Sequence, residues 1–345
     1  MPRMGERAYV YAKACGIIGK SFVGFRIAAL EPAGRLTDLD RLVFPQSFRE
    51  LPERELLVDL EQRILDSAVN QIISLVNSYA QPPEFLVRLL RSYEYEDLKS
   101  ALSAIAGKEA KAFTFTNLGR FGVVNFGAYP DMTAMVSGTE FESLISQASR
   151  EGESGIVLQI KLDKHYYTML WESLYRLKRQ DRDGIEAILA EEISLRNVVW
   201  ALRLRTYYHM SGDDVRERLI DLEFHPHSHK SGTGNRRSLV ADAEAMLELP
   251  LDAYSPWTSW KRMAFLNPGW GDAWTADPRY FQNAASRHLY HLARHYFHRR
   301  PFSVDTAACF IKLKQFEEDL LTSLAEGLGM GMTSRDVFAM LEVKL

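Results

Sequence analysis

The chain has 345 residues, 46% hydrophobic and 25% charged, an ordinary composition for a globular protein with room for two or three compact units. Its net charge of −3 excludes the basic field of a general nucleic-acid binder, and the distant Cys15 and Cys309 exclude a disulfide framework. No run reaches the roughly 18 apolar residues that span a bilayer, and the first residues lack a secretory signal, so we expect a cytoplasmic protein.

Residues 14–21, ACGIIGKS, satisfy the loose form of a phosphate-binding loop, with Ala14 where the first glycine normally stands. Such a loop needs a strand before it, a helix after it and a parallel sheet around it. The preceding AYVYA would pass for a strand, but the chain supplies no βα units and no apolar strand that ends in an Mg²⁺-binding aspartate. We therefore interpret Gly16, Gly19 and Gly24 as sites of close packing or of a break in an N-terminal helix.

Two helices are predicted next. Residues 52–78 carry apolar side chains at a 3.6-residue period over about seven turns. A proline pair stops this helix, and Pro83 can open the following one, which Gly107 ends. Residues 113–138, rich in glycine, asparagine and aromatics, indicate a connector of short helices with room for a strand at 122–126.

A second helix pair follows the connector. Asp163 is predicted to cap a helix that runs to Leu177, and residues 184–208 carry a long helical pattern. Ser211 then begins the next helix, with Asp214 three positions later, as in a capping box with aspartate in place of glutamate.

Two irregular segments separate this pair from the last helices. Residues 224–237 form a polar loop whose alternating histidines, His225, His227 and His229, we expect to lie in solvent. Residues 254–277 hold four of the six tryptophans, which either fill the core under a long connection or form an exposed patch that anchors a partner. These four are Trp257, Trp260, Trp270 and Trp274.

The C-terminal region is predicted to contain a helix that opens at Pro278, another over 303–327, and a capped terminal helix. Four histidines share one face of the first helix, about 80° wide: His288, His291, His295 and His298. Adjacent pairs have metal-chelating spacing, but the glutamate of a zinc protease is missing and arginines surround them, including Arg294 and Arg299. We expect these histidines and arginines to form a solvated, basic helix face that lines a cavity or contacts an acidic partner and binds no metal.

One helical unit recurs along the chain. Residues 196–219 align with 318–341 without a gap at a shift of 122, and a weaker copy begins at Glu96. The capping pair recurs as well, as Ser211 with Asp214 and as Thr333 with Asp336. Repetition of this kind indicates similar helix pairs stacked together, and hence an all-α fold that binds other proteins.

Several segments follow the pattern of one family. They are YVYAKA from Tyr9, LDKHYYTMLWESL from Leu162, EEISLRNVVWALRLRTYY from Glu191, MSGDDVRERL from Met210, DPRYF from Asp277, RPFSVDTAACFIKLKQFEEDLLTSLAEGLG from Arg300 and MTSRDVFAML from Met332. In order and spacing they resemble the C/d-type subunit of V-type and archaeal-type rotary ATPases. Residues 113–160 and the tryptophan-rich region fit the family pattern least.

The resemblance implies an all-helical funnel of three similar units, here 1–125, 126–240 and 241–345. It further implies a subunit on the cytoplasmic face of the membrane rotor ring that receives the foot of the central shaft, made of D- and F-type subunits, and couples its rotation to ion transport. No active site, cofactor or metal is implied. The family's shaft contacts form no short motif, so the candidate contacts come from the residue pattern: His288, His291, His295, Arg294 and Arg299 for the socket, with Lys13, Lys20, Arg26 and the four tryptophans as further candidates.

Two other hypotheses stand beside this one. A helical scaffold with unrelated protein partners would show the same repeats. An enzyme would be a nucleotide hydrolase built on residues 14–21 or a metal enzyme built on the histidines, and would need strands around Ala14 or a converging histidine–carboxylate site.

Overall fold

The computed structural model describes residues 4–107, 113–151, 155–224, 237–266, 274 and 276–343, and the regular secondary structure of these residues is almost entirely helical. Their α-helices are α1 (Met4–Ile18), α2 (Leu36–Val43), α3 (Glu53–Val76), α4 (Glu84–Leu90), α5 (Ser92–Ala106), α6 (Met132–Val136), α7 (Glu142–Glu151), α8 (Gly155–Tyr175), α9 (Asp183–Tyr208), α10 (Gly212–Arg216), α11 (Ala241–Glu244), α12 (Pro278–Phe297), α13 (Val304–Gly329) and α14 (Ser334–Met340). The prediction of an all-α fold is confirmed.

Short 3₁₀ helices and one minimal strand pair complete the secondary structure of the described residues. The 3₁₀ helices are η1 (Gly24–Leu30), η2 (Gly119–Phe121), η3 (Phe126–Ala128), η4 (Arg179–Asp181), η5 (Ser255–Ser259) and η6 (Met263–Phe265). Strands β1 (Glu223–Phe224) and β2 (Arg237–Ser238) pair antiparallel, Glu223 opposite Ser238. The connector predicted over 113–138 contains short helices, η2, η3 and the five-residue α6, as expected, but residues 122–126 form no strand.

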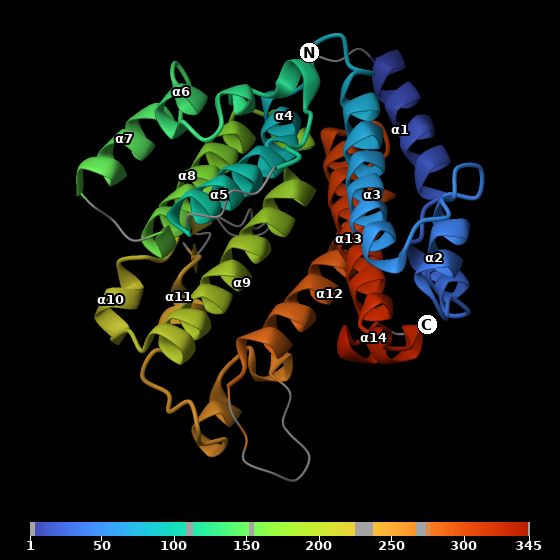
Figure 1. The fold of residues 1–345 in the computed structure, drawn as a ribbon. Helices are drawn as coiled ribbons and strands as arrows, with labels where there is room; N and C mark the ends of the chain where they lie inside the picture. The colour runs from blue at the N-terminus through green and yellow to red at the C-terminus, as the bar shows by residue number, and fades with distance from the viewer. Residues whose placement is uncertain are drawn as a thin grey trace. The chain divides into compact units, whose positions relative to one another are not determined.

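The chain divides into two compact units. Unit 1 comprises Met1–Pro83, Arg179–Ile188 and Arg279–Leu345, and unit 2 comprises Glu84–Lys178 and Leu189–Pro278. In unit 1, the long helices α3 and α13 lie side by side, α1 packs on both, and α2 and α14 pack against α13 (Figure 1). In unit 2, α4, α5 and α7 pack against α8. The division into three similar units stays a prediction.

Local sequence signals explain several features of the helices. The apolar stripe predicted over 52–78 forms α3, and its most regular members, such as Leu60 and Ile72, are fully buried. Gly107 is the C-cap of α5. The AYVYA segment, which would pass for a strand, lies inside α1.

One predicted cap is wrong. Asp163 lies in the middle of α8, where it is buried and accepts hydrogen bonds from Lys99 Nζ at 2.5 Å and Trp200 Nε1 at 2.9 Å. These two partners satisfy both carboxylate oxygens, so the side chain has no need of the backbone donors that a cap would use.

The repeated sequence has the same local structure in both copies. In one, α9 leads into α10, and in the other, α13 leads into α14. Residues 209 and 331, which the 122-residue shift aligns, both have left-handed backbone conformations, with φ of 51° at His209 and 82° at Gly331. The hydroxyls of Ser211 and Thr333 each accept a hydrogen bond from the backbone N–H three residues later, at 3.2 Å. The caps predicted at Ser211 and Thr333 are confirmed, and at Thr333 the Asp336 carboxylate also accepts the Thr333 N–H at 3.0 Å, which completes a reciprocal capping box.

The second copy also brings its two helices unusually close together. The N–H of Met332 donates to the carbonyl of Gly327 at 2.9 Å, and that of Gly331 to Leu328 at 3.0 Å, the two bonds of a Schellman motif. This sharp reversal folds α14 back so that a Cβ added to Gly327 would lie 2.3 Å from Cγ2 of the buried Val337. Only glycine allows this packing.

Candidate partner-binding site

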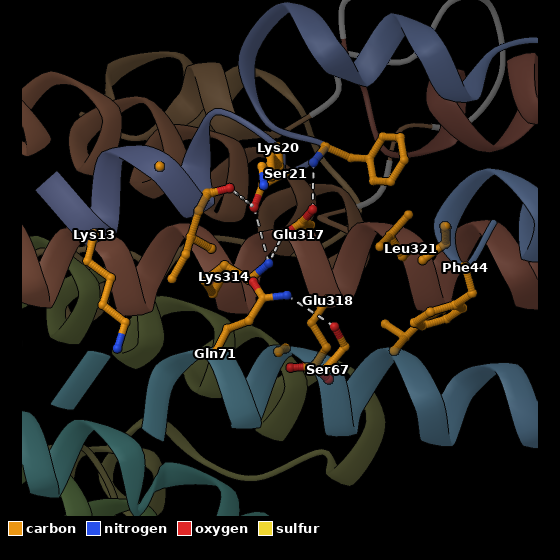
Figure 2. Close-up of a pocket in the computed structure, with 16 residues that line it drawn as sticks. Lys13, Lys20, Ser21, Phe44, Ser67, Gln71, Lys314, Glu317, Glu318 and Leu321 are labelled. Carbon is orange, nitrogen blue, oxygen red and sulfur yellow. Dashed lines mark hydrogen bonds and ion pairs between the residues drawn. The ribbon is translucent and has the colours of Figure 1, made fainter. Parts of the chain in front are cut away.

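A cavity of about 460 Å³ lies between α1, α3 and α13 of unit 1, and two predicted contact residues, Lys13 and Lys20, lie on its wall (Figure 2). Lys13 is held in place, because its Nζ donates to the carbonyl of Ser74 at 2.6 Å and to the Ser78 hydroxyl at 3.1 Å. Lys20 follows α1 and its side chain is exposed. Lys13 therefore acts as a clamp between α1 and α3, whereas Lys20 is accessible to a partner.

A buried ion pair forms the floor of this cavity. Lys314 and Glu317 lie one turn apart on α13 and pair directly, and Lys314 Nζ lies 3.3 Å from the Ser21 hydroxyl (Figure 2). Glu317 Oε1 accepts the backbone N–H of Phe22 at 2.5 Å. Because a buried charge is stable only when paired and hydrogen-bonded, this network fixes the chain after α1 onto α13. The sequence signal that was missed is a Lys–Glu pair within an apolar helical run.

Residues 14–21, the phosphate-loop string, have no backbone donors left for a phosphate where the chain leaves α1. The N–H groups of Gly19, Lys20 and Ser21 donate to the carbonyls of residues 15, 17 and 18 at 2.9, 2.9 and 3.1 Å, and that of Phe22 donates to Glu317. A phosphate loop needs these N–H groups to point at the ligand, and it needs a strand where α1 stands. In this conformation residues 14–21 form the end of α1 and the turn that follows it.

That turn and α12 bring three predicted cations into one region of unit 1. Gly24 has a left-handed backbone, φ 63°, and its N–H donates to the Tyr290 hydroxyl at 2.7 Å. The Arg294 guanidinium lies over the Tyr290 ring and fills the space in front of Gly24, 3.4 Å from where a Cβ would stand. Arg26 reaches back to the carbonyl of Gly19 at 3.5 Å, next to Lys20. Helix α12 therefore meets the 19–26 turn directly.

The three histidines of α12 and His298, which directly follows the helix, have different environments. His291 and His295 are exposed and His288 is half-buried, while His298, outside the candidate set, lies 3.1 Å from the Tyr11 hydroxyl. The pKa of His291 is lowered by partial burial and then by the positive charges of Arg294, Arg287 and His288. Within the described part of the chain, no three His, Cys, Asp or Glu side chains converge as metal ligands. The exposed Arg299 lies over the Tyr296 ring.

The tryptophans of unit 2 are mainly buried. Trp257 is 0% exposed, Trp260 packs edge-on against it, and their indole N–H groups donate to the carbonyls of Pro250 at 2.6 Å and Asp242 at 2.9 Å. Trp274 is half-buried and contacts Trp257. Of the two interpretations of this cluster, the geometry favours the core. Trp270 and the histidines at 225, 227 and 229 lie outside the described residues.

Of the helices in the described ranges, none is both long and apolar enough to cross a membrane. The chain is 28% identical over 327 residues to an uncharacterised protein of Treponema pallidum (strain Nichols). The alignment covers 94% of this chain and 92% of that protein. Residues 46–337 match the family described as ATP synthase (C/AC39) subunit. The chain therefore belongs to the C/AC39 family, a structural and non-catalytic subunit of the rotary ATPase.

Proposed function

We propose that this chain is a coupling subunit that links the central rotor shaft of a V-type or archaeal-type ATPase to its membrane rotor ring during ion translocation. The observation that carries the proposal is the family match over residues 46–337. The proposed partners are the D- and F-type shaft subunits and the ring subunits. The proposed location is peripheral, on the cytoplasmic face of the membrane complex, and the proposed shape is a funnel of three similar units.

The packing of unit 1 suits a part that transmits torque. A coupler must resist deformation, and close-packed helix interfaces are nearly incompressible. The long helices α3 and α13 lie side by side, and Lys13 ties α1 to α3 through Ser74 and Ser78. The buried Lys314–Glu317 pair joins the end of α1 to α13. A force applied at the 19–26 turn would thus pass into the longest helices of the unit.

The test is co-purification. The tagged chain would be recovered from detergent-solubilised membranes of its own cells, and the proteins that accompany it identified by mass spectrometry. The proposal expects the catalytic A and B subunits together with shaft and ring subunits. Their repeated absence, with unrelated proteins recovered in their place, would support the scaffold hypothesis and overturn the coupling function.

A further inference from the structure

An aromatic side chain stands almost entirely in water at the turn after α1. Phe25 is 91% exposed, although burying a phenyl ring is strongly favourable. Its neighbours are firmly held, since Phe22 N–H donates to Glu317 and Gly24 N–H donates to Tyr290. The backbone therefore presents Phe25 from a fixed position, and an exposed, pre-organised aromatic of this kind suits a partner's pocket.

Three basic side chains lie around this turn. Lys20 and Arg294 are exposed and Arg26 is half-buried. Contacts with the Gly19 carbonyl and with Gly24 place Arg26 and Arg294 beside the same turn. In the described ranges, none of the three has a carboxylate within ion-pair distance. Their positive charge is therefore left for a partner to neutralise.

We propose that Lys20, Phe25, Arg26 and Arg294 form a docking surface, the Phe25 surface, for an acidic protein segment that also offers an apolar pocket. The inference rests on the proposed function, because the partner would be another subunit of the rotary complex. Phe25 supplies the apolar anchor, and the three cations fix the orientation of the acidic segment around it.

The composition of the Phe25 surface favours a protein over a membrane or a nucleic acid. Arginine and aromatic residues are enriched at protein interfaces, and two of the three cations here are arginines. A polybasic lipid site usually contains four to eight Lys or Arg residues, more than this surface has. The net charge of −3 gives the chain no general attraction to nucleic acid.

Reassociation of purified chains with solubilised complex that lacks this subunit tests the inference. Phe25→Ala, Lys20→Glu and Arg294→Glu should each weaken association by on the order of tenfold or more, and added salt should weaken the wild type. Matched controls are Met330→Ala for an exposed apolar side chain and Arg54→Glu for an exposed α3 cation; both should associate like the wild type. Because Arg294 packs on Tyr290, Lys20→Glu serves as the variant that leaves the fold intact.

A photo-crosslinking residue at position 25, introduced into the chain in cells, identifies the occupant directly. The expected product joins position 25 to a peptide of another subunit in which Asp and Glu outnumber Lys and Arg. Crosslinking to lipid or to a basic peptide, or no crosslink from a chain that is recovered in the complex, would overturn the inference while the coupling function stands. Failure of the wild type to associate with the complex at all would overturn both.

Discussion

Replacing Gly327 with alanine should destabilise unit 1, because α14 packs directly on this glycine. The new Cβ would lie 2.3 Å from Cγ2 of Val337, far inside contact distance. Val337 has no room to turn away, since it is β-branched and fully buried on a helix that Thr333 caps. The substitution must therefore push α14 away from α13 or strain the Schellman turn between them.

Two opposing effects set the magnitude. Overpacking in a well-packed core costs about 1–3 kcal/mol, whereas alanine in place of a helical glycine gains about 1 kcal/mol. Because the contact is so short, we expect overpacking to win, with a net loss of about 1–2 kcal/mol. Gly16→Ala is the matched control: Gly16 is also helical, and nothing lies within 4 Å of its added Cβ. It should be neutral or stabilise by up to about 1 kcal/mol.

The assay must report unit 1 specifically. All six tryptophans belong to unit 2, so their fluorescence would follow the wrong unit. Hydrogen exchange of α13 and α14 peptides, combined with urea unfolding followed by far-ultraviolet circular dichroism, measures the relevant stability. The double variant Gly327→Ala/Val337→Ala should be more stable than the sum of the single effects predicts. A Gly327→Ala protein as stable as the Gly16→Ala control would refute the reasoning.

Three further substitutions test separate points. His209→Gly places glycine at the left-handed position that Gly331 occupies in the other copy, and should raise stability by up to about 1 kcal/mol in urea unfolding; a loss would argue that His209 makes a contact of its own. Burial raises the pKa of Asp305 to about 6. Between about pH 4 and 6 the folded state therefore keeps this carboxyl protonated while the unfolded state has lost the proton. The contribution of Asp305 to the free energy of unfolding consequently falls as pH rises through that window. Asp305→Asn should therefore increase the free energy of unfolding above pH 6, by at most about 3 kcal/mol, with the gain disappearing near pH 4 in urea titrations at several pH values. Lys20→Ala should leave nucleotide binding by the isolated chain unchanged from background in equilibrium dialysis, and wild-type binding that the substitution abolished would revive the hydrolase hypothesis.

The candidate site could be predicted only in part. The basic character of α12 follows from its histidine and arginine spacing, and Lys20, Arg26 and Arg294 were among the candidates because charge can be read from residue type. Their convergence on one turn depends on the hydrogen bond between Gly24 and Tyr290, two residues that are 266 positions apart in the sequence. The exposure of Phe25 was missed because an apolar residue after a helix usually packs inward.

Features that arise from contacts a few residues apart could be predicted from the sequence alone. Helical periods, the Ser211 and Thr333 caps and the duplicated helix pair depend on bonds that span three to five positions, so a local pattern specifies them. Long-range packing, in contrast, makes Asp163 a buried partner of Lys99 instead of a cap and places Trp257 and Trp260 in the core. It also brings the Phe22 N–H to Glu317, 295 positions away. The physical reason is that the environment of a polar or aromatic side chain is created by whichever distant elements pack against it, and no local pattern records those elements.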